Sequence, residues 1–217
     1  MIEHVYRRAS AARSLDAVIV ATDDERIAEA VDRFGGIACM TSTTHVSGTD
    51  RLAEVAAATP CALLVNIQGD EPLLDPNVID AAVRPLVDDA SIAMGTAARR
   101  LRNEEELTSP GMVKVVCDAA GFALYFSRAP IPHGRDGSPI ALARIHVGLY
   151  VYRRDTLLQL ARLAPTPLEC TEALEQLRAL EHGIRINVVD TEFQSHEVNT
   201  AEDLAHVRQL MLASTHG

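Results

Sequence analysis

Short apolar runs separated by single helical segments dominate the first half of this 217-residue chain. The runs at 17–21, 37–40 and 62–67 are rich in aliphatic residues, many of them β-branched. Strands of this kind are buried on both faces, and strands that alternate with helices form a parallel sheet covered by helices. The spacing of apolar residues predicts helices over 2–13, 24–34, 49–58 and 76–87, followed by a further strand over 91–97.

The alternation of strands with single helices ends after residue 110. The segments 112–116 and 122–126 flank the turn 118–121 and predict a β-hairpin. A Pro- and Gly-rich loop, a strand, two helices, a strand and a final helix follow, over 129–139, 146–152, 154–163, 168–182, 184–189 and from Thr200 onward. We therefore predict one α/β domain over 1–217, doubly wound, with a mainly parallel sheet and an antiparallel insertion over roughly 112–152.

Composition excludes several function classes. The 20 Lys and Arg residues are outnumbered by 30 Asp and Glu, and a net charge of −10 disfavours a nucleic-acid polymer as partner. No apolar run reaches the ~20 residues that a membrane helix needs, so no membrane association is expected. The four cysteines include no CxxC pair, which favours reduced, structural thiols and a cytoplasmic protein.

One acidic motif follows a predicted strand directly. Gln68, Gly69, Asp70 and Glu71 come at the carboxyl end of the strand 62–67. Ligands of open parallel sheets bind at this edge, and a carboxylate there can hold Mg²⁺ together with substrate phosphates. The alternative is a solvated turn without a ligand.

A second motif opens a helix. Ser47 and Gly48 precede the predicted helix 49–58, and Arg51 lies in its first turn. Exposed backbone N–H groups at a helix start favour an anion, and Arg supplies a forked donor. The alternative is an ordinary N-cap with a surface arginine.

Several blocks together resemble the family of the 3-deoxy-manno-octulosonate (Kdo) cytidylyltransferases. They occur in the family's order over nearly the whole chain: SGTDRLAEV (47–55), NIQGDEP (66–72), MVKVV (112–116), ALYFSRAPIP (123–132), HVGLYVYR (146–153), PTPLECTEALEQLR (165–178) and VNTAEDL (198–204). The resemblance implies a nucleotide-diphospho-sugar transferase-like fold with a small antiparallel lobe that forms a homodimer. It also implies transfer of CMP from CTP to Kdo, giving CMP-Kdo and pyrophosphate for lipopolysaccharide synthesis.

The resemblance also assigns roles to residues. It implies catalytic roles for Asp70 and Gln68, with Asp70 as a ligand of Mg²⁺. The implied nucleotide contacts are Ser47, Gly48, Arg51 and Gln68, and the implied sugar contacts are Arg128, His146, Tyr150, Glu175 and Gln176. Asn199 stands where the family has a second metal-binding Asp, and its amide oxygen still suits a hard cation.

The residues alone leave part of this open. On a helix over 168–182, Glu169, Glu172 and Gln176 would share one stripe, which without the resemblance indicates a solvated face. Glu175 would point about a quarter-turn away from Gln176. His146 is equally compatible with an ordinary histidine at a sheet edge.

The family pattern also includes a segment that would precede Met1. Family members normally begin with an apolar strand and a loop ending Gly-Lys-Pro that cradles the triphosphate. We therefore expect the chain to lack its first strand and its phosphate-binding loop. Two alternatives follow: an inactive nucleotide-binding remnant, or a cytidylyltransferase for another acidic sugar.

Overall fold

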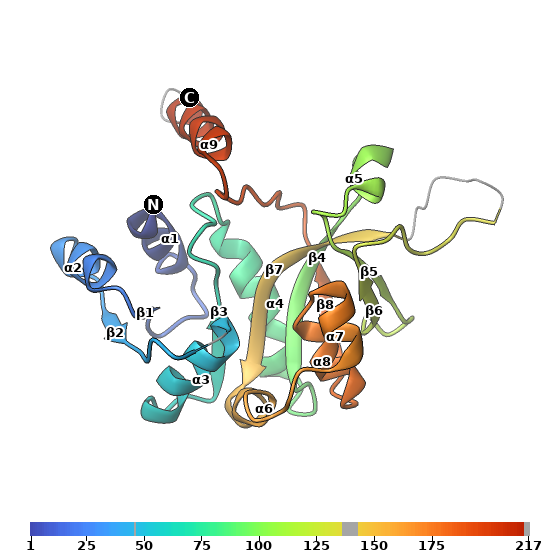
Figure 1. The fold of residues 1–217 in the computed structure, drawn as a ribbon, viewed down its shortest axis with the longest axis horizontal. Coiled ribbons are helices and arrows are strands. Elements are labelled where there is room, and N and C mark those ends of the chain that lie inside the picture. The colour runs from blue at the N-terminus through green and yellow to red at the C-terminus, as the bar shows by residue number, and fades with distance from the viewer. Residues whose placement is uncertain (46, 136–142, 215–217) are drawn as a thin grey trace.

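The computed structural model describes residues 1–45, 47–135 and 143–214. Helices and strands alternate through the first half (Figure 1). These elements are α1 (Ile2–Ala9), β1 (Val20–Thr22), α2 (Glu25–Arg33), β2 (Ala38–Met40), α3 (Gly48–Ala58), β3 (Leu63–Asn66), α4 (Pro76–Asp88) and β4 (Met94–Arg100). The second half contains α5 (Glu104–Thr108), β5 (Lys114–Cys117), β6 (Ala123–Ser127), β7 (Arg144–Arg153), α6 (Arg154–Leu160), α7 (Pro167–Glu172), α8 (Gln176–Glu181), β8 (Ile186–Asp190) and α9 (Ala201–Ser214).

The larger sheet has six strands in the order β6-β5-β7-β4-β8, with β3 paired to β7 as well. β3 and β4 both pair antiparallel with β7, and β4 pairs parallel with β8. Consequently β3, β4 and β8 run in one direction and β7 runs against them. The α/β class is confirmed, and so is the predicted hairpin of β5 and β6. The strand predicted over 146–152 is a central member of the main sheet.

Helices cover both faces of this sheet. On one face, Val147, Leu149 and Val151 of β7 join a buried cluster with residues of α4. On the other face, Tyr152 and residues of β4 pack with α3, α6 and α8. Each fully buried aliphatic side chain stabilises such layers by roughly 1.5–3 kcal/mol. The candidate site lies on the second face.

A bulge interrupts the pairing of β4 with β7. Thr96 lies opposite Tyr150, but the next residue of β4 lies opposite Val147, so Gly148 and Leu149 are extra. The Thr96 hydroxyl donates to the carbonyl oxygen of Leu149 at 2.6 Å and holds the bulge closed. Because two residues are inserted, alternation is preserved and His146 stays on the same face as Tyr150. Bulges of this kind are common beside active sites.

The strands β1 and β2 form a separate parallel sheet. Among the described residues, β1 is hydrogen-bonded only to β2, and β3 only to β7. The two strands lie at one end of the longest axis, and the β5–β6 hairpin lies toward the other (Figure 1). Ile19 and Val20 are half-buried. The prediction of a strand over 17–21 buried on both faces is wrong in this respect, because Ala17 is exposed and residues 18–21 are only partly buried.

The single helix predicted over 168–182 is wrong. The helix α7 ends at Glu172, Ala173 adopts a left-handed conformation with φ of 51°, and α8 begins at Gln176. Side-chain contacts across the break, described below, outweigh the local helical pattern. Among the described residues, no helix is long and apolar enough to cross a membrane.

Candidate active site

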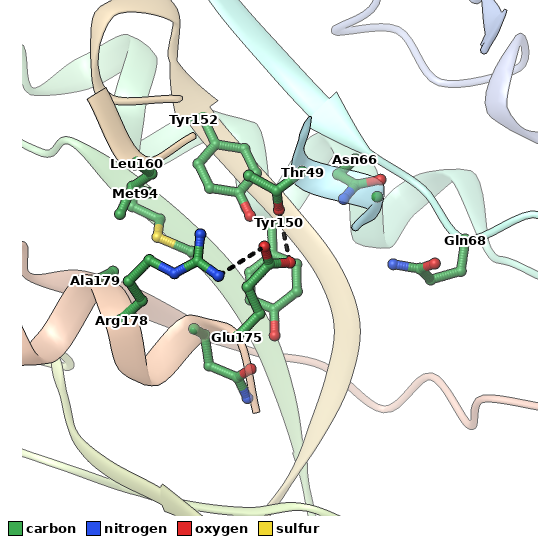
Figure 2. A pocket seen from close by; sticks show the side chains of 12 residues that line it. Thr49, Asn66, Gln68, Met94, Tyr150, Tyr152, Leu160, Glu175, Arg178 and Ala179 are labelled. Atoms are coloured by element: carbon green, nitrogen blue, oxygen red, sulfur yellow. Dashed lines mark hydrogen bonds and ion pairs between the residues drawn. The ribbon is translucent and has the colours of Figure 1, made fainter. Parts of the chain in front are cut away.

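A cavity of about 110 Å³ lies where α3, the end of β3, β7 and α8 meet (Figure 2). Its lining consists of Gly48, Thr49, Asn66, Gln68, Met94, Tyr150, Tyr152, Leu160, Glu175, Gln176, Arg178 and Ala179. Five of these residues were predicted as site residues from the sequence: Gly48, Gln68, Tyr150, Glu175 and Gln176. The structure therefore brings together residues that are spread over 129 sequence positions, from 48 to 176.

Two polar atoms of this lining lack a hydrogen-bond partner in the described part of the chain. They are Oε1 of Glu175 and Nε2 of Gln176. Gln176 is only 7% exposed. Buried polar atoms are nearly always paired in folded proteins, because an unpaired one loses its hydrogen bonds to water without compensation. Oε1 of Glu175 has only the Arg178 guanidinium nearby, at 3.7 Å, so the unpaired amide of Gln176 is the stronger indication of a polar ligand.

Aromatic side chains of β7 form one wall. Burial raises the pKa values of Tyr150 and Tyr152, so both hydroxyls stay protonated. The ring of His146 lies 5.2 Å from that of Tyr150, just outside the cavity lining. Burial lowers the pKa of His146 to about 3, and its Nε2 lies 2.9 Å from the hydroxyl of Thr96. This wall therefore offers neutral hydrogen-bonding groups at neutral pH.

The start of α3 forms a further part of the lining, with Thr49 beside Tyr150 and Tyr152 (Figure 2). Ser47 caps this helix, since its hydroxyl oxygen accepts from the N–H of Asp50 at 3.1 Å. A Cβ built on Gly48 would meet no atom within 4 Å, so the backbone here faces open space. Arg51 does not line the cavity. It forms an ion pair with Asp23 at 3.0 Å and donates to the hydroxyl of Thr41, joining the carboxyl ends of β1 and β2.

The acidic loop after β3 contacts a distant segment. The N–H of Val198 donates to the carbonyl oxygen of Asp70 at 2.9 Å, which places Asn199 on the segment beside Asp70. Oδ1 of Asp70 is buried and has no hydrogen-bond partner among the described residues. The amide of Asn199 donates to the Glu197 carboxylate at 3.2 Å. The two predicted metal ligands thus lie on adjoining segments.

Glu71 is buried at the same junction, and its carboxylate accepts from the N–H of His196 at 3.4 Å. Burial raises the pKa of Glu71 to about 7, and the charges of Glu197 and Asp70 add to the increase. Because burial is the main cause, Glu71 is partly protonated near neutral pH.

The residues present fit Mg²⁺ in the way nucleotide enzymes usually bind it. Within the described residues, no group of three or more His, Cys, Asp or Glu side chains could hold a metal ion alone. Mg²⁺ is commonly bound through one or two protein oxygens, with substrate phosphates completing the shell. The unpaired oxygen of Asp70 and the amide oxygen of Asn199 are ligands of the required hard type.

Arg128 lies outside the cavity lining. Its guanidinium donates to the carbonyl oxygens of Glu172 at 2.7 Å, Pro110 at 3.0 Å and Ala173 at 3.2 Å. These bonds fix the end of α7. Its contact with a sugar, which the resemblance implies, stays a prediction.

Four polar lining residues were missed from the sequence: Thr49, Asn66, Tyr152 and Arg178. Strand alternation places Tyr152 on the same face as Tyr150, so period two was a usable signal for it. Asn66 is the last residue of β3 and lies two positions before Gln68 of the predicted motif. Arg178 gave no local signal, because its contacts depend on the break between α7 and α8.

The chain is similar in sequence to known cytidylyltransferases. The profile of a family described as cytidylyltransferase matches residues 1–186. A 3-deoxy-manno-octulosonate cytidylyltransferase from Geobacter metallireducens is 55% identical over 217 residues, covering 95% of this chain and 85% of the relative. The enzyme of that name from Solibacter usitatus is 54% identical and covers 99% of this chain and 85% of the relative. The chain belongs to the cytidylyltransferase family and, within it, to the group of the 3-deoxy-manno-octulosonate cytidylyltransferases.

Solved structures agree. A CMP:2-keto-3-deoxy-manno-octonic acid synthetase, solved in complex with CTP, superposes with a TM-score of 0.94 at 39% identity, covering 98% of this chain and 88% of that one. A 4-diphosphocytidyl-2C-methyl-D-erythritol synthase from Anaerococcus prevotii superposes at 0.63 with 14% identity, covering 97% of this chain and 88% of that one. The second likeness shows the fold alone, and the fold is that of a nucleotidyltransferase.

Proposed function

We propose that this protein transfers a CMP group from CTP to 3-deoxy-D-manno-octulosonate, giving CMP-Kdo and pyrophosphate for lipopolysaccharide synthesis. The observation that carries the proposal is the buried amide of Gln176, which has no hydrogen-bond partner among the described residues and belongs, with Glu175, to the lining of the cavity between the α3 start and β7. The relatives that are more than half identical are named for this reaction. A solved relative holds CTP.

The nucleotide is proposed to bind along α3 and the end of β3. Backbone N–H groups at the start of α3, an 11-residue helix capped by Ser47, suit a polar or anionic group. The open backbone at Gly48 permits close approach of a ligand. The amide of Gln68 supplies a donor and an acceptor for a base or ribose. Arg51 would act at the edge of this subsite, through the ends of β1 and β2.

The acidic sugar is proposed to bind between β7 and α8. The amide N–H of Gln176, which has no hydrogen-bond partner among the described residues, suits the carboxylate of the sugar, and Oε1 of Glu175, whose only described neighbour of opposite charge is Arg178 at 3.7 Å, suits a sugar hydroxyl. Tyr150 and His146 add neutral partners, because burial keeps the first protonated and the second uncharged. Arg128 would help by holding the end of α7 in place.

In the proposed reaction, a hydroxyl oxygen of the sugar forms a bond with the α-phosphorus of CTP, the bond from that phosphorus to pyrophosphate breaks, and the hydroxyl proton is released to solvent. Bound Mg²⁺ would supply neutralisation of phosphate charge, which is the main catalytic need in such transfers. Asp70 and Asn199 would hold it. Glu175 and Gln176 would orient the sugar, and α3 would orient the nucleotide, so positioning is the chain's principal contribution.

The test is pyrophosphate release by the purified protein with CTP, Mg²⁺ and Kdo. We expect release that depends on all three. A panel of other acidic sugars distinguishes the alternative in which another sugar is the acceptor. A protein that folds and binds CTP, but does not release pyrophosphate with any of the acidic sugars, would instead be an inactive nucleotide-binding remnant.

We further infer a cytoplasmic homodimer, as the resemblance to the family implies. The net charge of −10 and the absence of a membrane-spanning helix among the described residues are compatible with it. Sedimentation equilibrium tests the assembly: a mass of one chain at micromolar concentration would contradict it.

A further inference from the structure

The pair of Glu169 and Arg178 is buried and doubly bonded. Arg178 donates to the two carboxylate oxygens of Glu169 at 2.8 and 2.5 Å, and the two side chains are 11% and 9% exposed. Glu169 also accepts from the N–H of Thr166 at 3.0 Å, in a capping box at the start of α7. The pair therefore connects the first turn of α7 with the first turn of α8.

This contact requires the break between the two helices. Residues nine positions apart are separated by roughly 13 Å along the axis of a continuous helix, at 1.5 Å per residue. The break at Ala173, whose φ is 51°, folds α8 back so that Arg178 reaches Glu169. A positive φ is unfavourable for alanine, so tertiary contacts must hold it.

The residues placed by this break are Glu175 and Gln176. Glu175 is the N-cap residue of α8, and Gln176 is its first residue. The Arg178 guanidinium lies 3.7 Å from Oε1 of Glu175, while the other oxygen of Glu175 accepts from Thr49 at 2.8 Å (Figure 2). Both residues reach the cavity because they stand at a helix start instead of on the side of a long helix.

We propose that Glu169 and Arg178 are positioning residues for the acidic sugar: their ion pair maintains the break at Ala173 and thereby directs Glu175 and Gln176 into the cavity. This inference rests on the proposed function and adds to it a pair of residues that sets affinity for the sugar but not for the nucleotide. Buried ion pairs contribute little net stability, because desolvation offsets their attraction. A role in positioning gives the pair a function beyond stability.

The chain offers a matched control. Arg99 and Glu106 form a second buried pair with two bonds of 2.8 Å, with side chains 5% and 9% exposed, and neither residue lines the cavity. We compare Glu169→Gln with Glu106→Gln by steady-state kinetics and thermal unfolding. For Glu169→Gln, the KM for the sugar should rise about tenfold or more, because even a small misplacement of binding groups weakens binding strongly. The KM for CTP should stay within about twofold of the wild-type value.

The control should lose thermal stability without a comparable change in either KM. Arg178→Lys keeps the charge but loses the forked pair of donors. Its KM for the sugar should lie between those of the wild type and Arg178→Met. Combining Glu169→Gln with Arg178→Met should raise the KM no further than Arg178→Met alone, because both remove one interaction. An unchanged KM for the sugar in Glu169→Gln, or an equal rise in Glu106→Gln, overturns the proposal.

A structural measurement separates this proposal from the proposed function. In a crystal structure of Glu169→Gln, we expect Ala173 to leave the left-handed region and Glu175 to lose its bond to Thr49. An unaltered connection between α7 and α8 in that variant overturns the positioning role whatever the acceptor is. If the wild-type protein does not use Kdo, the proposed function fails by itself, and the crystal structure still decides the positioning role.

Discussion

The hydroxyl of Thr49 donates a hydrogen bond of 2.8 Å to the carboxylate of Glu175, which is 126 positions away in the sequence. This bond joins the first turn of α3, on the proposed nucleotide side, to the start of α8, on the proposed sugar side. The two subsites therefore share a direct polar contact.

Replacing Thr49 tests this contact. Thr49→Val keeps the shape but removes the donor, so that Oε2 of Glu175 loses its hydrogen bond and neither carboxylate oxygen has a hydrogen-bond partner among the described residues. We expect the free energy of unfolding to fall by about 1–3 kcal/mol. We also expect a severalfold rise in the KM for the sugar. Thr49→Ser retains the hydroxyl and should restore the KM; a valine variant with wild-type KM would show that the bond does not position Glu175.

Asp70 is predicted to be the main protein ligand of Mg²⁺. Asp70→Asn should lower turnover by at least about 10²-fold with the fold intact, because it removes the charge that anchors the cation. Asp75→Asn is the matched control, since Asp75 caps α4 by accepting from the N–H of Asn77 at 2.9 Å. The control should affect melting temperature slightly and turnover not at all. Turnover of Asp70→Asn within a few-fold of wild type would refute the assignment.

Asn199 allows the converse test, in which a carboxylate is added to the proposed Mg²⁺ site instead of removed. Asn199→Asp adds a carboxylate on the segment beside Asp70 and next to Glu197. Without metal the added charge should destabilise the protein slightly, by like-charge repulsion. With metal it should lower the Mg²⁺ concentration that gives half-maximal activity. An unchanged or higher Mg²⁺ requirement would indicate that other groups complete the site.

The raised pKa of Glu71 predicts a pH-dependent stability. Burial raises the pKa from 4.5 to about 7, so the folded state holds a proton that the unfolded state releases. This contribution is fully present below pH 4.5 and is lost as the pH rises to about 7, with a magnitude on the order of 3 kcal/mol. In metal-free buffer, Glu71→Gln should therefore gain stability relative to wild type as pH rises across that window. A difference in the free energy of unfolding between the two proteins that stays constant from pH 4.5 to 7.5 would contradict the pKa shift.

The order of elements was predictable because periodicity is a local property. The helices at 24–34 and 76–87 and the hairpin around 118–121 follow from spacing and turn residues, and all are confirmed. The grouping of Gln68 with Tyr150 in one cavity is also observed. Gln68 follows from its place at a strand end, where parallel sheets bind ligands, whereas Tyr150 was assigned only by the resemblance to the family.

The connection between α7 and α8 was not predictable by the same means. The segment 168–182 has helical spacing throughout, and no local residue marks a stop at Ala173. The break depends on Glu169 and Arg178, whose contact exists only in the folded chain. Likewise, nothing in the sequence shows that the Arg128 guanidinium is engaged by three carbonyl oxygens.

The separation of β1 and β2 from the larger sheet has a consequence for local opening. Within the described residues no backbone hydrogen bond of the ladder joins β1 to β3, so helix packing and the bonds of Arg51 to Asp23 and Thr41 hold the small sheet in place. Regions with few cross-connections open at lower free energy than the core. The amide protons of Val20 and Thr41, which are bonded within the small sheet, should exchange with deuterium faster than that of Val188 in β8. If Arg51 contacts CTP as proposed while keeping its bonds to Asp23 and Thr41, bound CTP should slow that exchange and make this end of the fold more rigid.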